Sequence, residues 1–175
     1  MDEARYQAIF DFPVIDYYQR LGFDLEKESF EELGAEFISA YEEQRSRCTL
    51  QSGAYGLLEK LNRSGYCQTV LSAYQHDALL TALEGFGLLN FFDEVLGLDD
   101  IYAHGKIEQG RRLMEALKTQ PSDCLFIGDT VHDYEVACAM GVDCRLVVAG
   151  NHSREKLETC GVPVYDNFHG IFPDL

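Results

Sequence analysis

Two aspartates lie four residues apart, directly after the strongest strand signal in the chain. Cys124-Leu125-Phe126-Ile127 is an apolar run, Gly128 permits a tight turn, and Asp129 follows at its tip. Asp133 then stands at or near the start of a helix expected over residues 133–140. Both carboxylates can face one cleft and bind Mg²⁺, which takes a few carboxylates, waters and phosphate oxygens as ligands. Alternatively, Asp129 caps a turn and Asp133 caps the helix, as Asp often does.

Two further positions have side chains that could contact a phosphate group. Ser72 follows a strand expected over residues 68–71, and its hydroxyl could hydrogen-bond a phosphate oxygen, together with backbone N–H groups from Ala73 onward. Lys106 begins a helix expected over residues 106–118, where its charge could neutralise phosphate or hold a carboxylate in place. The structural alternatives are a helix-capping serine and a solvated surface lysine. The order of these residues along the chain favours one shared phosphate site.

The elements that must position these residues alternate between strand and helix from about residue 51 onward. Short apolar strands are expected at residues 68–71, 94–96, 124–127, 145–148 and 162–165. Helices are expected at residues 54–62, 76–85, 106–118, 133–140 and 154–160. This alternation predicts an α/β fold, with a parallel sheet covered by helices. Ligands of such sheets bind at the carboxyl ends of the strands, which is where the polar residues above fall.

The first 48 residues have a different pattern, with apolar residues repeated at helical spacing and no convincing strand. Gly22 is a plausible helix stop, and Pro13 suits the first turn of a helix. We therefore predict a small helical domain over residues 1–50 and an α/β domain over residues 51–175.

These motifs, in this order, resemble those of the haloacid dehalogenase (HAD) superfamily. Val70-Leu71-Ser72 resembles its second motif, Lys106 its third, and Gly128-Asp129 with Asp133 its acidic fourth. The helices of residues 1–48 resemble the helical cap of phosphoglycolate-phosphatase-like members. The resemblance implies a Rossmann-like core and a Mg²⁺-dependent phosphomonoester hydrolase. In such an enzyme Asp129 and Asp133 would hold the metal and Ser72, Ala73 and Lys106 would contact the substrate, Lys106 also positioning the nucleophile.

The family's first motif, an apolar strand ending in Asp-x-Asp-Gly-Thr, does not occur in residues 1–175. The only superficial candidate is Ile9-Phe10-Asp11-Phe12-Pro13, which lacks the second Asp and the Gly-Thr turn. Without this motif we expect no covalent intermediate and therefore no catalysis by the chain as given. In the family this strand lies mid-sheet, between the strands that end here at Ser72 and Ile127. We therefore expect a perturbed sheet, or self-association or strand exchange that fills the place of the absent central strand.

Three functions follow from these observations. The first is a truncated form, or one with a misassigned start, of a phosphatase acting on a small phosphorylated metabolite. The second is a non-catalytic binding or regulatory module derived from the same fold. The third is a fragment of a haloacid dehalogenase, but the acidic pair favours Mg²⁺ and phosphate, because halide displacement needs no metal. His104 and His132 flank the motifs and are interpreted as turn or surface residues.

Composition limits the partners and the compartment. The chain has 30 acidic and 14 basic side chains, a net charge of −16, which argues against binding to nucleic acid or to an anionic membrane. The six cysteines include no C-x-x-C pair, so a disulfide framework or a zinc site is not expected. Apolar runs stay well below the roughly 18 residues that span a bilayer, and the acidic N-terminus is no signal peptide. We expect a reduced, cytoplasmic protein.

Overall fold

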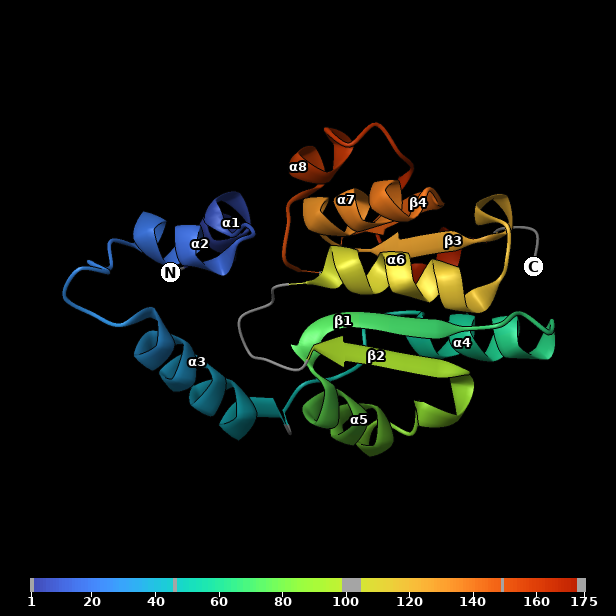
Figure 1. Cartoon of the computed structure of the whole chain (residues 1–175), viewed down its shortest axis with the longest axis horizontal. Helices are drawn as coiled ribbons and strands as arrows, with labels where there is room; N and C mark the ends of the chain where they lie inside the picture. The colour runs from blue at the N-terminus through green and yellow to red at the C-terminus, as the bar shows by residue number, and fades with distance from the viewer. Residues whose placement is uncertain (1, 46, 99–104, 149, 173–175) are drawn as a thin grey trace.

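The computed structural model describes residues 2–45, 47–98, 105–148 and 150–172 (Figure 1). The α-helices are α1 (Glu3–Ile9), α2 (Val14–Leu21), α3 (Phe30–Arg45), α4 (Ala54–Arg63), α5 (His76–Gly85), α6 (Lys106–Leu117), α7 (Val131–Met140) and α8 (Arg154–Glu158). The strands are β1 (Thr69–Gln75), β2 (Glu94–Leu98), β3 (Leu125–Gly128), β4 (Asp143–Val147) and β5 (Val164–Tyr165). The described residues also form the short 3₁₀ helices η1 (Leu89–Phe91), η2 (Pro121–Asp123) and η3 (Phe168–Gly170). Strands and helices alternate from α4 onward, as the sequence predicts for an α/β fold.

The N-terminal helices α1–α3 lie beside the α/β part, on the side toward which the arrows of β1, β2 and β3 point (Figure 1). Gly22 ends α2 in the left-handed conformation (φ 96°), which glycine adopts at little cost. Tyr17 and Tyr18 on α2 are buried. The ring of Tyr6, on α1, and the ring of Phe10, directly after α1, pack against Tyr17. These ring contacts pack α1 against α2.

All paired strands run parallel, but they form two separate sheets. One sheet has the order β1–β2 and the other has the order β3–β4–β5. Among the described residues no ladder joins β1 to β3, so each of these two strands has one unpaired edge. The interruption lies between β1, which contains Ser72, and β3, which Asp129 follows, at the place where the absent first motif leads us to expect a perturbed sheet.

Burial differs between strands with two neighbours and strands with one. In β4, which lies between β3 and β5, Cys144, Leu146 and Val147 are buried. In β1 and β3 no residue is fully buried, although both are largely apolar. The molecule accordingly has two cores, one around β4, α7 and α8 and one around α5, and α6 packs against both α7 and β1.

The first strand is longer than predicted and contains a bulge. The prediction for residues 68–71 was wrong at the carboxyl end, because β1 continues to Gln75. Regular pairing ends at Leu71, opposite Leu96, and resumes at Gln75, opposite Leu98. A side chain at Gly97 would overlap the backbone of the bulged strand and of His76, so glycine is needed there. The bulge places Ser72 and Ala73 inside the strand rather than after it.

The remaining boundaries agree with the predicted ranges within a few residues. Differences of two residues occur at one end of α7, α8, β2, β4 and β5; for example, α7 begins at Val131 instead of Asp133. No helix in the described part of the chain is long and apolar enough to cross a membrane.

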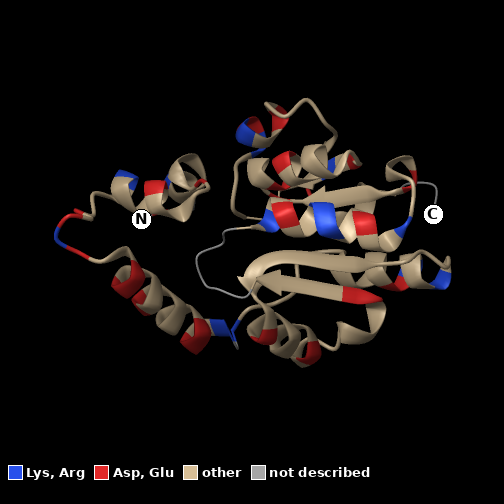
Figure 2. Cartoon of the chain, viewed as in Figure 1, with Lys and Arg blue, Asp and Glu red and all other residues tan. Residues whose placement is uncertain are grey.

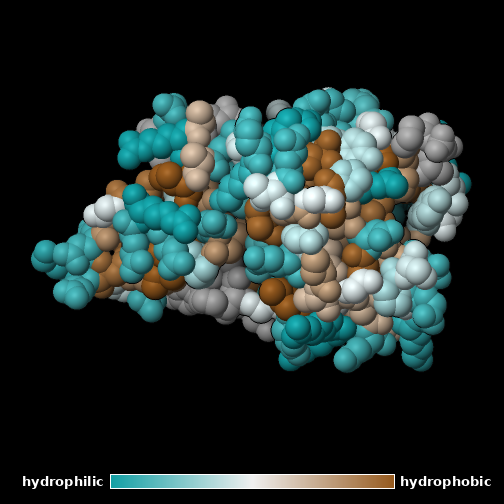
Figure 3. Space-filling model, turned by 90° about the horizontal axis from the view of Figure 1, so that it is seen from above, coloured by the Kyte–Doolittle hydropathy of each residue, from teal (hydrophilic) through white to brown (hydrophobic). Residues whose placement is uncertain are grey.

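Acidic residues occur on many elements, including both ends of α3 (Figure 2). Figure 3 shows hydrophilic side chains over much of one face, with smaller apolar areas between them. The large apolar residues that are exposed are Phe23, Phe37, Tyr41, Tyr55 and Tyr66. Acidic residues are therefore not confined to the elements that carry Asp129 and Asp133.

Candidate active site

The candidate site begins where β3 passes into α7. Thr130 caps α7 through a capping box, in which its hydroxyl accepts a hydrogen bond from the Asp133 N–H. Asp133 is therefore the third residue of the helix, and its carboxylate points back toward the end of β3. A side chain at Gly128 would overlap the Cβ and Cγ of Asp133, so only glycine allows this approach.

Asp133 and Lys106 form a buried ion pair. Lys106 Nζ lies 2.5 Å from Asp133 Oδ1, and the two side chains are only 11% and 6% exposed. Asp133 Oδ2 accepts hydrogen bonds from the backbone N–H groups of Asp129 and Thr130 and from the Thr130 hydroxyl. Burial raises the pKa of Asp133, but the charge and hydrogen bond of Lys106 outweigh it, so this pKa lies below its usual value. Both oxygens of Asp133 are thus engaged within the protein.

Asp129 has a different environment. Its Oδ2 accepts a hydrogen bond of 2.8 Å from Asn151 Nδ2, and within the described ranges no Lys or Arg forms an ion pair with it. Burial and the nearby charge of Asp133 raise the pKa of Asp129. Two carboxylates and one ammonium leave a net negative charge, so a cation beside Asp129 would be favourable.

The residues present fit a Mg²⁺ site in which the protein supplies only one or two ligands. Across the described ranges, no group of three or more His, Cys, Asp or Glu side chains could hold a metal ion. Mg²⁺ is often bound by one or two carboxylates, with the other ligands taken from water and phosphate. Asp129 suits the role of direct ligand better than Asp133, because Asp133 already pairs with Lys106. The assignment of both aspartates as metal ligands stays a prediction.

Ser72 and Ala73 lie in the other sheet from Asp129. The Ser72 hydroxyl accepts a hydrogen bond of 3.1 Å from the backbone N–H of Tyr74, within the bulge. None of the hydrogen bonds or ion pairs described links Ser72 to Lys106 or Asp129. The structure therefore joins Lys106, Asp133 and Asp129 through hydrogen bonds, whereas Ser72 and Ala73 belong to the other sheet.

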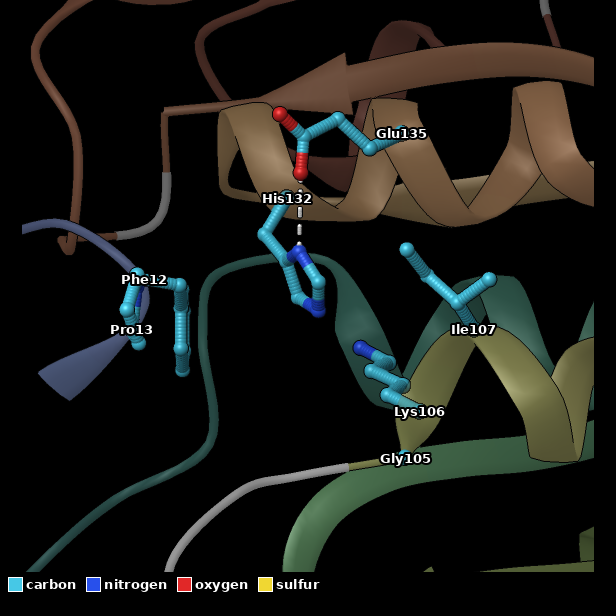
Figure 4. Close-up of a pocket in the computed structure, with 7 residues that line it drawn as sticks. All are labelled: Phe12, Pro13, Gly105, Lys106, Ile107, His132 and Glu135. Carbon is cyan, nitrogen blue, oxygen red and sulfur yellow. Dashed lines mark hydrogen bonds and ion pairs between the residues drawn. The ribbon is translucent and has the colours of Figure 1, made fainter.

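A cavity of about 240 Å³ opens beside Lys106. It is lined by Phe12, Pro13, Gly105, Lys106, Ile107, His132 and Glu135 (Figure 4). The His132 ring lies against the Phe12 ring with centroids 4.9 Å apart, and its Nδ1 lies 3.0 Å from Glu135. The interpretation of His132 as a turn or surface residue was wrong, because its side chain is 16% exposed and lines the cavity. His104 lies outside the described residues.

The residues that join the helical segment to this site lie outside the motifs found in the sequence. His152 is fully buried; its Nδ1 accepts from the Val131 N–H, and its Nε2 lies 3.1 Å from the Phe10 carbonyl. Lys156 donates to the same carbonyl and pairs with Asp11 at 3.2 Å. A usable signal existed, because the polar run 150–153 follows the carboxyl end of a strand, as the identified residues do.

Lowering the pH should loosen this connection through His152. Burial and the charge of Lys156 lower the pKa of His152 below 6.5, against weaker opposing effects of Asp11 and Asp133. Neutral His152 therefore contributes stability that is present above pH 6.5 and lost as the pH falls through its folded-state pKa. Protonation would leave the Val131 N–H without an acceptor, a loss of about 1–3 kcal/mol.

The measurement is urea denaturation between pH 7.5 and 5, followed by circular dichroism. The His152→Gln variant keeps an acceptor and a donor but does not titrate, so its stability should fall less over this range. Equal pH dependence of the two proteins would show that His152 is not the titrating group.

The chain is similar to known proteins over most of its length. A family model described as "Haloacid dehalogenase-like hydrolase" matches residues 1–147. Phosphoglycolate phosphatase 1 of Pseudomonas aeruginosa is 27% identical over 140 residues, which are 78% of this chain and 51% of that protein. Pyrophosphatase PpaX of Bacillus velezensis is 30% identical over 105 residues, 56% of this chain and 48% of that protein. The chain thus spans about half the length of the curated relatives that it matches.

Solved structures share the fold. A predicted phosphatase from Clostridium acetobutylicum has a TM-score of 0.73 at 20% identity, covering 94% of this chain and 77% of that one. A predicted phosphoglycolate phosphatase from Haemophilus somnus has a TM-score of 0.73 at 20% identity, covering 96% of this chain and 80% of that one. At 20% identity the likeness to these structures supports the fold alone. The family itself is shown by the family model, which covers most of the chain. The chain belongs to the haloacid dehalogenase-like hydrolase family.

Proposed function

We propose that this chain carries the cation- and phosphate-binding residues of a Mg²⁺-dependent phosphatase acting on a small phosphorylated metabolite. The observation that supports this most is the half-buried Asp129 beside the Lys106–Asp133 ion pair, at the carboxyl end of β3. The relatives named phosphoglycolate phosphatase support the substrate class. The strongly acidic surface disfavours nucleic acid and anionic membranes as partners.

Each residue of the site has a role in this proposal. Mg²⁺ held at Asp129 would supply positive charge to neutralise the phosphate oxygens. Lys106 has ammonium protons beyond the one that Asp133 accepts, so it could also contact a phosphate oxygen. The cavity beside Lys106 would hold the rest of the substrate against Phe12 and His132 (Figure 4). Its volume of about 240 Å³ suits a small metabolite.

The chain by itself should bind Mg²⁺ and phosphate without turnover, because residues 1–175 contain no Asp-x-Asp motif to supply a nucleophile and an acid/base. Isothermal titration with Mg²⁺ should show binding to the unchanged chain. We expect at least tenfold weaker binding by Asp129→Asn, which removes the direct carboxylate ligand. Asp143→Asn, at the exposed amino end of β4, is the matched control and should bind like the unchanged chain.

Hydrolysis of p-nitrophenyl phosphate with Mg²⁺ should be undetectable for the same chain. Turnover that Asp129→Asn abolishes would instead assign the nucleophile to Asp129 and contradict the proposed role. Absence of both Mg²⁺ binding and turnover would favour the second candidate, a non-catalytic module of the same fold. That candidate is supported by the engagement of both Asp133 oxygens within the protein.

We also propose a reducing, cytoplasmic environment for the protein. The cysteines are free, and three of the six, Cys48, Cys67 and Cys138, are exposed. Exposed thiols persist in a reduced compartment and tend to be oxidised outside it.

A further inference from the structure

A chain of hydrogen bonds leads from the first helix to the candidate metal ligand. The Tyr6 hydroxyl, on α1, donates to Asn151 Oδ1 at 2.8 Å. Asn151 Nδ2 in turn donates to Asp129 Oδ2 at 2.8 Å. The three residues are far apart in sequence, and none of the motifs identified in the sequence includes Tyr6 or Asn151.

The Tyr6 hydroxyl fixes the orientation of the Asn151 amide. An amide group has a donor and an acceptor side, and its correct orientation follows from its hydrogen-bond partners. With the hydroxyl donating to Oδ1, Nδ2 must face Asp129, where it stabilises the charged carboxylate. The reversed amide would place a carbonyl oxygen against the carboxylate of Asp129, which is repulsive. Burial and the charges of Tyr17 and Asp129 raise the pKa of Tyr6 to about 12, so its hydroxyl remains a donor near neutral pH.

We propose that Tyr6 and Asn151 are positioning residues for Asp129, and that Mg²⁺ binding at Asp129 and docking of α1 onto the site stabilise each other. This inference rests on the proposed function, since it assumes that Asp129 binds the cation. Coupling of this kind is reciprocal: if docked α1 strengthens Mg²⁺ binding, then Mg²⁺ strengthens the docking of α1 by the same factor.

The helical segment also has contacts that do not involve Asn151, and these provide a control. Gln7 Nε2, one residue after Tyr6, donates to the carbonyl of Gly150 at 3.3 Å. Gln7→Ala therefore loosens the same helix from the same loop without changing the Asn151 amide. A purely structural role of Tyr6 would make Gln7→Ala and Tyr6→Phe alike in their effect on Mg²⁺ binding.

The test is isothermal titration of Mg²⁺ into the full chain and three variants. Asn151→Ala should weaken Mg²⁺ binding about tenfold, as is typical when a partner of a metal ligand is removed. Tyr6→Phe keeps the ring packing against Tyr17. It should weaken Mg²⁺ binding about threefold, which corresponds to the loss of one modest hydrogen bond. Gln7→Ala should leave the affinity unchanged.

Hydrogen exchange supplies a second measurement that is independent of affinity. Mg²⁺ should slow amide exchange in α1 of the unchanged chain and of Gln7→Ala, but not of Asn151→Ala. Mg²⁺ binding that is insensitive to Tyr6→Phe and Asn151→Ala would overturn this inference and leave the proposed function intact. Equal weakening by Gln7→Ala would also overturn it, because general tethering would then explain the effect. Failure of the unchanged chain to bind Mg²⁺ would contradict the proposed function itself.

Discussion

Replacing Asp133 with alanine is expected to lower the free energy of unfolding by about 3–5 kcal/mol, because it leaves the other member of a buried ion pair uncompensated. Lys106 would lose a partner at 2.5 Å while remaining only 11% exposed. The backbone N–H groups of Asp129 and Thr130 would lose the same acceptor. Urea denaturation at pH 7 measures the effect, and Asp143→Ala on the exposed end of β4 is the control.

The size of the loss in unfolding free energy distinguishes a buried ion pair from a solvated one. The double variant Lys106→Met with Asp133→Leu removes both charges, and we expect it to be more stable than Asp133→Ala alone. A loss below about 1 kcal/mol for Asp133→Ala would show that the pair is solvated like a surface ion pair.

The pH dependence of the same pair has a defined sign. The folded-state pKa of Asp133 is lower than its ordinary value of 3.8. Its contribution to stability is therefore fully present above that value and is lost as the pH falls through the folded-state pKa.

The second large effect is expected at the unpaired edges of β1 and β3. Strand edges present unpaired N–H and C=O groups that can bind another strand. At low protein concentration, backbone amides on these edges should exchange with solvent about 100-fold faster than the amides of β4, which has a strand on each side. Hydrogen exchange with residue-level detection measures the difference.

Raising the protein concentration should favour self-association through the same edges. Light scattering should then show larger species, and exchange on the facing edges of β1 and β3 should slow. The outer edges of β2 and β5 are also unpaired and serve as an internal control. Association that protects only those outer edges, or slow exchange of β1 and β3 in a dilute monomer, would disprove strand pairing at this place.

The fold was predictable where local signals were strong. Helix α5 was predicted at its observed bounds, and α6 within one residue, because an amphipathic pattern is bounded by turn residues. The end of β1 was not predictable, because the bulge depends on the close approach of Gly97 on a neighbouring strand. The interruption between β1 and β3 agrees with the perturbed sheet expected from the absent first motif, although no local pattern describes pairing between such distant segments.

The site was predictable in composition but not in geometry. Asp129, Asp133 and Lys106 lie together, because α7 begins directly after β3 and α6 packs against α7. The sequence could not show that Asp133 points back into a capping box, since helix-capping and metal-binding aspartates occur at the same positions. Tyr6 and Asn151 were missed because their hydrogen bond joins residues separated by 145 positions.

The residues predicted to contact phosphate and metal, Ser72 and Asp129, come from two separate sheets. Ser72 belongs to the β1–β2 sheet, whereas Asp129 follows β3 of the other sheet. A phosphate group that contacted both residues would therefore act as a cross-link between the two halves of the core. Part of the binding free energy of the phosphate would then oppose separation of the two sheets. Variants that bind phosphate more tightly would therefore also resist mechanical unfolding of the core more strongly.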